Sequence, residues 1–191
     1  MQHITLGQAE LIPWYVCGFY FAASYLSVKH TRIEESVRSK IVRYAPMVFA
    51  ALMLSEKYFH VGVLGMRFVS DAFWIHVVGI VITSIGMAFT IWARATLSDN
   101  WSPNITLKEQ HQLIRSGPYA LVRHPIYTGF SFALIGGVLQ IGEYRAIVAY
   151  AILLIAHSMK AKREEKLMAA QFGQQYAEYR KHSGFLIPRF R

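Results

Sequence analysis

Long runs of apolar residues, broken by short polar segments, constrain this chain more than any other feature of its sequence. A membrane-spanning helix needs about 20 consecutive, mostly apolar residues. A chain of 191 residues that is 54% hydrophobic and gathers its apolar residues into such runs does not resemble an ordinary soluble domain. The runs, which predict an all-α integral membrane protein with about five transmembrane helices, cover residues 11–28, 44–58, 72–93, 126–141 and 146–159.

The last two apolar runs are short for a membrane span, and only the four residues from Gly142 to Arg145 separate them. Helices joined by so short a connection are antiparallel neighbours. We therefore expect spans four and five to form a helical hairpin. The chain length fits one domain, so we treat residues 1–191 as a single membrane domain. It has three transmembrane helices in residues 1–93 and the hairpin in residues 94–191.

The distribution of Lys and Arg predicts how the chain is oriented in the membrane. Five spans place seventeen of the twenty Lys and Arg on one side, with five in 29–43, four in 94–125 and eight in 160–191. Cytoplasmic segments are enriched in Lys and Arg, so we expect a multi-pass protein with its N-terminus outside and its C-terminus in the cytoplasm. The same distribution argues against nucleic-acid binding, because the positive charge follows the inner membrane face, where anionic lipids attract it.

Several other classes are disfavoured by what the sequence contains. No Lys or Arg and no small-residue cleavage site precede Leu11, so we do not expect a cleaved signal peptide. Cys17 is the only cysteine, which excludes an internal disulfide and a cysteine-based metal site, and we expect no bound metal. The spans hold few ionisable residues and no visible repeat, which argues against a transporter. Gly136-Gly137 could mark a broken helix, but close helix packing is the simpler explanation.

The stretch GPYALVRHPIYTG, residues 117–129, predicts the start of span four at the cytoplasmic surface. Gly117-Pro118 is a turn signal. Pro125 suits the first turn of a helix, because its missing N–H would be unpaired there anyway. His124 precedes that proline and is therefore biased away from helical backbone geometry.

Two interpretations of this helix start remain open. A helix N-terminus offers free N–H groups and a positive dipole end, and Arg123 and His124 add donors and positive charge at the same point. Together with Tyr119 and Tyr127, which bracket them, they would form an anion site in a half-dry pocket. Alternatively, the arginine extends to lipid phosphate, the histidine caps the helix and the tyrosines form an interfacial belt.

The C-terminal tail predicts an amphipathic helix over residues 160–182 that lies on the cytoplasmic interface. Its apolar side chains recur at three- and four-residue spacing, at Leu167, Met168, Phe172, Tyr176 and Tyr179. Glu164 and Glu165 fall in its first turns, on the same membrane face as Arg123 and His124. These carboxylates either complement the helix dipole or approach the cationic pair. In the second case the site suits a zwitterion such as an amino acid headgroup.

Three blocks in the last hundred residues together resemble the isoprenylcysteine carboxyl methyltransferase family. They are WARATLSDNWS, HQLIRSGPYALVRHPIYTG and REEKLMAAQFGQQYAEYRKHSGFLIP, in this order. Phospholipid N-methyltransferases share a looser version of the pattern. The resemblance implies an integral membrane enzyme that uses S-adenosyl-L-methionine. It also implies that residues 94–191 form the cofactor-binding, catalytic half of the chain. The sequence has no G-x-G-x-x-G fingerprint of a Rossmann cofactor site.

The resemblance also implies where the cofactor lies: at the cytoplasmic face, enclosed by the segment before span four, the start of span four and the C-terminal helix. The residues that match the family's cofactor contacts are His111, Gln112, Leu113, Ile114, Tyr119, Arg123, His124, Tyr127 and Glu165, with the backbone of 112–114 facing the adenosine part. Arg94 and Asn100 match residues near the methyl acceptor, and Glu164 is a further catalytic candidate.

The methyl acceptor is expected to be lipophilic, either a small molecule or a lipidated one, with its tail between helices and its polar end at the cytoplasmic interface. A carboxylate acceptor is ionised at neutral pH and needs no general base, and Arg94 would position it. An amine acceptor must lose a proton, for which Glu164 or a histidine would be the base. Membrane lipids are the other expected partners. The oligomeric state is not indicated.

Two rival functions follow from the same pattern. Membrane sterol reductases, which use NADPH, have a similar C-terminal arrangement. Their sequence after RHP resembles Asn-Tyr followed by Gly-Glu, whereas this chain has Ile126-Tyr127 followed by Gly129-Phe130. The missing Asn and Glu count against a reductase. A non-enzymatic membrane scaffold is the second rival, and it leaves the polar clusters without a ligand.

Overall fold

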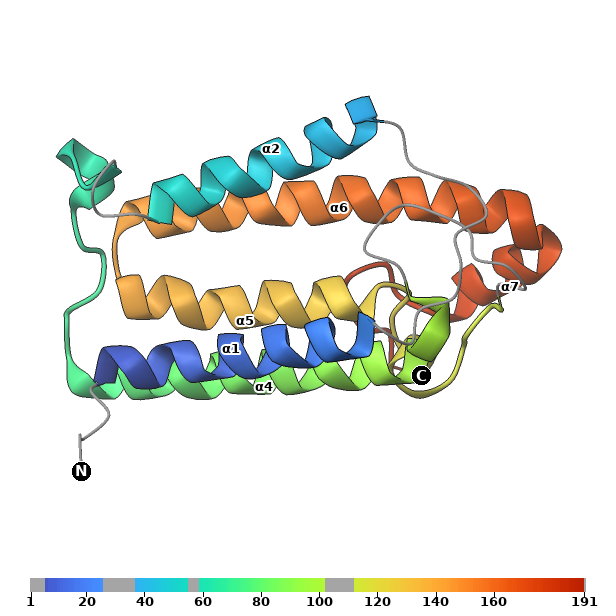
Figure 1. Cartoon of the computed structure of the whole chain (residues 1–191), viewed down its shortest axis with the longest axis horizontal. Coiled ribbons are helices and arrows are strands. Elements are labelled where there is room, and N and C mark those ends of the chain that lie inside the picture. Colours follow the sequence, from blue (N-terminus) through green and yellow to red (C-terminus); the bar gives the residue numbers. More distant parts are fainter. Residues whose placement is uncertain (1–5, 26–36, 55–58, 102–111, 191) are drawn as a thin grey trace.

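The structure is a computed structural model that describes residues 6–25, 37–54, 59–101 and 112–190. Within these ranges every secondary-structure element is a helix. Figure 1 shows the long helices lying side by side. The six α-helices are α1 (Leu6–Tyr25), α2 (Val37–Leu54), α4 (Phe73–Leu97), α5 (Pro125–Ile141), α6 (Tyr144–Phe172) and α7 (Gln174–His182). This confirms the all-α fold class.

Helices α4 and α5 pack almost backbone to backbone because small residues face each other along the contact. A Cβ added at Gly86 would lie 2.5 Å from the backbone nitrogen of Ala133, and one added at Gly79 would lie 2.9 Å from the carbonyl oxygen of Gly136. Thr83 donates a 3.2 Å hydrogen bond across the contact to the carbonyl of Ala133. Helix α5 continues through Gly136, so this glycine serves close packing, as expected, and not a helix break.

The other helices cover this central pair. Helix α1 packs on α4 and α5, where Cys17, Met87 and Ala133 form a buried cluster. Helix α2 packs on α6, where Ala50, Met53 and Ala149 form a second cluster. In Figure 1, α2 lies along α6 on one side of the molecule, and α1 lies along α4 and α5 on the other.

The α5–α6 connection is tighter than the sequence predicts, and a neighbouring segment braces it. Gly142 adopts a left-handed backbone with φ of +68°, which ends α5, and α6 begins at Tyr144. Phe68 donates a 2.9 Å backbone hydrogen bond to the carbonyl of Gly142. The buried Glu143 and Arg145 pair at 2.6 Å, and the Arg145 guanidinium also donates to the backbone carbonyl of Leu54 at the end of α2. The polar residues of this turn therefore connect three elements.

The prediction of a separate helix over residues 160–182 is wrong. Helix α6 runs without a break from Tyr144 to Phe172, so the last apolar run and the charged tail are one helix. It ends at Gly173, whose φ of +48° is easily adopted only by glycine. The chain then turns into the short α7, which Figure 1 shows next to the end of α6. Glu164 lies twenty residues beyond the start of α6, so it does not complement the dipole at that helix's N-terminus.

The membrane-span expectation is met only in part by helix length and composition. Among the described residues, one helical stretch, Phe73–Asn100, is both long and apolar enough to cross a bilayer. Residues Tyr44–Leu54 and Pro125–Ile141 are apolar but shorter. Residues 11–25 of the first predicted span lie in α1, and residues 26–28 lie outside the described ranges. The fifth predicted span lies in the first half of α6.

Candidate functional site

A cavity of about 580 Å³ lies where the start of α5 and the middle of α6 face each other, near α1. Its volume is within the usual range of about 300–1,000 Å³ for small-molecule sites. Nine of the residues predicted for the site line it: Asn100, Gln112, Leu113, Ile114, Tyr119, Arg123, His124, Tyr127 and Glu164. We refer to it as the main cavity.

The start of α5 holds two cationic residues in fixed positions. Pro125 is the first residue of α5, as the sequence predicts, and His124 precedes it with a non-helical backbone, at φ −123° and ψ 59°. The His124 side chain does not cap the helix, so the capping alternative is wrong. Arg123 donates a 2.9 Å backbone hydrogen bond to the carbonyl of Gly184. The segment after α7 therefore lies against residues 122–123 and holds them at the cavity wall.

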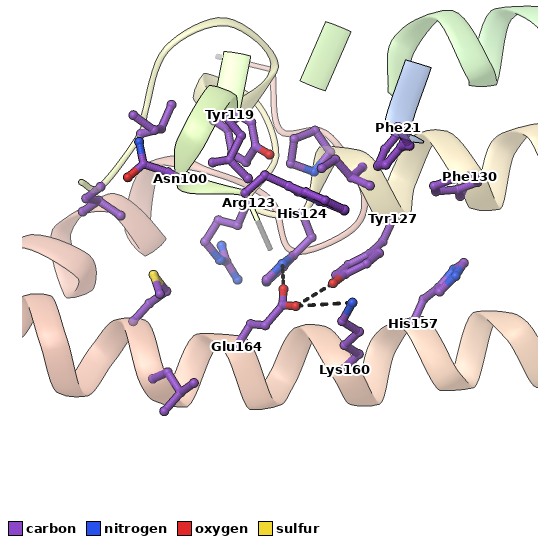
Figure 2. A pocket seen from close by; sticks show the side chains of 18 of the residues that line it. Phe21, Asn100, Tyr119, Arg123, His124, Tyr127, Phe130, His157, Lys160 and Glu164 are labelled. Atoms are coloured by element: carbon purple, nitrogen blue, oxygen red, sulfur yellow. Dashed lines mark hydrogen bonds and ion pairs between the residues drawn. The ribbon is translucent and has the colours of Figure 1, made fainter. Parts of the chain in front are cut away.

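Glu164 is the centre of a charged cluster inside the main cavity, which Figure 2 shows from close by. Tyr127 donates a 2.6 Å hydrogen bond to its Oε1 atom. His124 Nδ1 lies 3.7 Å from Oε2, and Lys160 Nζ lies 3.9 Å from Oε1. Three side chains from two helices thus converge on one carboxylate, and Figure 2 shows it pointing from α6 toward α5.

Glu165 holds the cationic residues from the neighbouring position. Its Oε1 atom accepts a 2.5 Å hydrogen bond from Arg123 Nε and lies 3.5 Å from His124 Nε2. Arg180 of α7 approaches the other oxygen at 3.8 Å. Glu165 is not among the residues that line the main cavity. It therefore positions Arg123 and His124 from behind the wall.

These contacts set the protonation states of the cluster. Burial lowers the pKa of His124, but the carboxylates of Glu164 and Glu165 more than offset it, so the pKa lies above the usual 6.5. Burial raises the pKa of the Glu164 carboxyl, yet His124, Lys160 and Tyr127 bring it below the usual 4.5. For Glu165, His124 and Arg123 overcome the effect of burial and lower the pKa to about 2. These shifts favour a protonated His124 between two ionised carboxylates.

Hydrogen bonds to Tyr119 and Asn100 hold the rest of the polar end in place. Tyr119, buried in the wall, is held by Tyr179 of α7, which donates a 2.7 Å hydrogen bond to its backbone carbonyl. Burial raises the pKa of the Tyr119 hydroxyl well above its usual value, so it stays a neutral hydrogen-bonding group. Asn100 Oδ1 accepts a 3.2 Å hydrogen bond from the backbone N–H of Gln112. This bond ties the end of the α4 region to the segment that precedes α5.

Arg94 does not reach the main cavity. It is buried, and its two Nη atoms donate to the backbone carbonyls of Ser98 and Ser24, at 2.6 and 2.7 Å. Its guanidinium lies over the ring of Trp101, 4.6 Å from the centroid, and Trp101 itself lines the cavity. Arg94 therefore supports the wall from behind. His111 lies outside the described residues.

Of the residues that line the main cavity and were not predicted for the site, three are of particular interest: His157, Lys160 and Phe21. His157 and Lys160 precede Glu164 at helical spacing, on the face of α6 that continues to Leu167 and Met168. The ring of His157 stacks on Tyr127 with centroids 5.4 Å apart. The third, Phe21, comes from α1, far away in the sequence. The helical periodicity of α6 carried a signal for the first two, whereas nothing local indicated Phe21.

The two ends of the main cavity differ in character. Its charged end holds Glu164 and His124. Its other end is walled by apolar side chains of α1, α4 and α5, including Phe21, Met87 and Phe130. Phe21 and Phe130 contact each other, with centroids 5.9 Å apart. The cavity therefore suits one ligand that joins a charged group to a hydrocarbon. It equally suits two ligands, one that carries the charged group and one that carries the hydrocarbon.

Comparison with known proteins agrees with this arrangement. The model of the isoprenylcysteine carboxyl methyltransferase family matches residues 77–170, which include the start of α5 and the Glu164–Glu165 pair. The chain resembles this family over that segment. The matched segment contains the α4–α5 contact and the charged cluster, so the family match covers the part of the fold that builds the site.

Individual relatives of the family match more of the chain. A protein-S-isoprenylcysteine O-methyltransferase of Xenopus laevis is 23% identical over 93% of this chain. A probable protein-S-isoprenylcysteine O-methyltransferase of Oryza sativa subsp. indica is 30% identical over 60% of it. The alignments cover 64% and 62% of those proteins. The chain therefore spans slightly less than two thirds of the length of the curated relatives it matches.

A solved structure shares the fold. The eukaryotic intramembrane Ras methyltransferase ICMT superposes with a TM-score of 0.57 and 23% sequence identity. The match covers 82% of this chain and 54% of that chain. The two chains therefore share a helical fold.

The family uses S-adenosyl-L-methionine as methyl donor, and the residues of the main cavity fit that molecule. Its amino acid part is a zwitterion, and the cavity wall offers both a protonated His124 and an ionised Glu164. The Nδ1 atom of His124 lies 3.7 Å from Glu164, which lines the cavity, whereas its buried Nε2 lies 3.5 Å from Glu165 without forming a hydrogen bond. An imidazole in this position can donate a hydrogen bond to an anionic group of a ligand.

Proposed function

We propose that this chain is a membrane-embedded methyltransferase that transfers the methyl group of S-adenosyl-L-methionine to a carboxylate on a lipophilic acceptor. The observation that carries this proposal is the two-ended main cavity, with Glu164 and His124 at one end and Phe21 and Phe130 at the other. The charged end suits the cofactor, and the apolar end suits the acceptor's tail. The family match supports the same activity.

The cofactor-binding residues follow from the charges and the wall. His124 and Arg123 would face the carboxylate of the cofactor's amino acid part, and Glu164 would face its ammonium group. Asn100, Tyr119 and the backbone of residues 112–114 would hold the adenosine. When bound, S-adenosyl-L-methionine supplies a methyl group made electrophilic by its sulfonium sulfur.

The protein's own task is then to orient the acceptor and exclude water. Tyr127 and His157 stack against each other in the cavity wall beside Glu164. A carboxylate acceptor arrives ionised, so no side chain has to remove a proton. Lys160, which also lines the cavity, is a cation that can attract it.

The charged cluster favours a carboxylate acceptor over an amine. A general base must be free to accept a proton. Glu164 already accepts the hydroxyl hydrogen bond of Tyr127, and its pKa lies below the usual 4.5. The raised pKa of His124 favours its protonated form, which has no site left to accept a proton. Glu164 is ionised, but its lowered pKa makes it a weak base, so a carboxylate acceptor, which needs no base, fits the cluster better.

The membrane arrangement belongs to the same proposal. Helices α1, α2, α4 and α5 and the first half of α6 span the bilayer, with the N-terminus outside and the C-terminus in the cytoplasm. The Lys- and Arg-rich segments 29–43, 94–125 and 160–191 then lie together on the cytoplasmic side, as the positive-inside tendency requires. The charged end of the main cavity opens at that face, and its apolar end lies at the depth of the lipid tails. Helix α7 lies at the interface.

A calorimetric titration of the purified protein in detergent tests cofactor binding. We expect saturable binding of S-adenosylhomocysteine and none of NADPH. Binding of NADPH alone would replace the proposal with a reductase. Binding of neither ligand by a folded protein would leave the scaffold alternative.

Transfer itself is measured with a radiolabelled methyl donor and N-acetyl-S-farnesylcysteine as acceptor. A methyl ester releases labelled methanol in mild alkali, whereas a methylated amine does not. Alkali-labile product is the expected result, and alkali-stable product formed from an aminolipid acceptor instead would favour N-methylation.

A further inference from the structure

A second cavity lies behind the main cavity along the same seam between α1, α5 and α6. It has a volume of about 340 Å³, and we refer to it as the deep cavity. Its walls are mostly aliphatic, with Leu11 on α1, Leu134 and Ile141 on α5, and Leu153 on α6. Such a surface suits a hydrocarbon chain better than a polar ligand.

The order of residues along each helix shows that the two cavities are arranged end to end. On α5, Tyr127 and Phe130 line the main cavity, and Gly137 lines the deep cavity. At a rise of about 1.5 Å per residue, Gly137 lies roughly 15 Å beyond Tyr127 along the helix axis. On α6, which runs in the opposite direction, His157 lines the main cavity and Leu153 the deep one.

Trp14 separates the two cavities. It is the one described residue that lines both of them. On α1, Phe21 and Cys17 line the main cavity on one side of it, and Leu11 lines the deep cavity on the other. A Cβ added at Gly137 would lie 3.9 Å from Cζ2 of the Trp14 indole, so the ring lies against the backbone of α5.

We propose that Trp14 sets the maximum length of the acceptor's hydrocarbon tail by closing the inner end of the main cavity. The inference rests on the proposed function, in which the tail occupies the apolar end beside Phe21 and Phe130. A tail that passes those rings meets the indole of Trp14, and the aliphatic space of the deep cavity lies directly behind it. Replacing the indole with a small side chain joins the two cavities and lets a longer tail be buried.

The expected size of the effect follows from hydrocarbon burial. Each methylene group that moves from water into an apolar cavity strengthens binding by up to about fourfold. In the wild-type protein, affinity should rise with tail length and then level off once the tail reaches Trp14. In Trp14→Ala, the rise should continue through the chain lengths at which the wild type has levelled off.

The experiment measures equilibrium binding and methyl transfer for a series of N-acetyl-S-alkylcysteines with saturated tails from octyl to eicosyl. Trp14→Ala and the milder Trp14→Leu are compared with the wild type, so that a folding defect in one variant does not remove the test. Tyr15→Ala is the matched control, because Tyr15 is the next residue on α1, is 70% exposed and lines neither cavity. A double variant, Trp14→Leu with Leu153→Phe, places a larger side chain from α6 in the space that opens when the indole is removed.

In both Trp14 variants, we expect the affinity to level off at a longer tail length than in the wild type. In the double variant it should level off at a shorter length again. Tyr15→Ala should match the wild type. An unchanged plateau in folded Trp14→Leu or Trp14→Ala protein overturns the inference, whether or not methyl transfer occurs. A shifted plateau in binding without transfer of methyl to any member of the series keeps the role of Trp14. In that case the proposed carboxylate methylation fails separately.

Discussion

The hydroxyl of Tyr127 donates a 2.6 Å hydrogen bond to Glu164, which joins the first turn of α5 to the middle of α6 across the main cavity. The same carboxylate lies within ion-pair distance of His124 and Lys160. Glu164 is therefore held by both helices that form the walls. A ligand that binds there meets a carboxylate whose direction is already fixed, which reduces the ordering cost of binding.

We expect Tyr127→Phe to weaken the binding of S-adenosylhomocysteine by at least about 1.5 kcal/mol, or roughly tenfold, the typical value for a hydrogen bond to a charged group. The substitution keeps the ring that stacks on His157 and removes only the donor to Glu164. Calorimetric titration measures the change. Tyr15→Phe, on the exposed face of α1, is the control and should bind as the wild type does. Equal affinities for Tyr127→Phe and wild type would show that this hydrogen bond does not serve the ligand.

We expect His124→Ala to weaken cofactor binding by at least about 1.5 kcal/mol, because it removes a protonated donor from the wall. The buried Nε2 atom, which has no hydrogen-bond partner among the described residues, is the group lost. The affinity for S-adenosylhomocysteine is again the quantity measured. A folded variant with wild-type affinity would remove His124 from the binding site.

Glu165→Gln should also weaken cofactor binding by at least about 1.5 kcal/mol, but by an indirect route. The substitution keeps the shape and removes the charge that holds Arg123 at 2.5 Å. Because Glu165 positions Arg123 and His124, loss of its charge should change the affinity for the cofactor. It should also change how that affinity depends on pH. A variant with unchanged affinity and an unchanged pH profile would show that these cations need no support from Glu165.

The stability of the protein should fall in acid partly through Glu165. Its pKa is depressed in the folded protein, to about 2 from the usual 4.5. A depressed carboxyl pKa stabilises the folded state above the unfolded value, and that stabilisation is lost as the pH falls from about 4.5 toward 2. Thermal melting in detergent should therefore decline more steeply over this range for the wild type than for Glu165→Gln. Parallel declines would contradict the assigned ion pairs.

Gly86→Val should destabilise the fold by about 1–3 kcal/mol or more, since it forces the α4–α5 contact apart. A Cβ at this position meets the backbone of Ala133 at 2.5 Å, and neither backbone can yield without shifting a helix. The melting temperature in detergent is the measurement. Gly7→Ala is the matched control, because an added Cβ there has no neighbour within 4 Å. If Gly86→Val melts with the wild type, the two helices do not pack as closely as described.

The extent to which the sequence predicted the site depends on whether the signal was local. Pro125 starts α5 as expected, because proline at a first helical position is a local preference. The boundary at residue 160 was wrong because the apolar run ends there while nothing in the chain breaks the helix before Gly173. Hydrophobicity marks where an apolar surface ends, whereas helix termination depends on backbone geometry.

The position of Arg94 could not be predicted from the sequence motif alone. Its residue type matched the family motif, yet its two Nη atoms are taken up by the carbonyls of Ser98 and Ser24. The Ser24 contact joins residues 70 positions apart in the chain, so sequence spacing carried no sign of it. Whether this arginine faces a ligand or a helix end depends on the packing of α1 against α4.

The sequence by itself determined that the chain is helical and rich in apolar runs, that its positive charge gathers in alternate segments, and that a helix starts at Pro125. These properties follow from local composition and backbone preference. Only the tertiary structure decided that Glu165 pairs with Arg123, 42 residues away, and that Trp14 stands between two cavities. Both depend on how closely separate helices approach, and that distance is set by the small residues where α4 meets α5 and by side chains that are far apart along the chain.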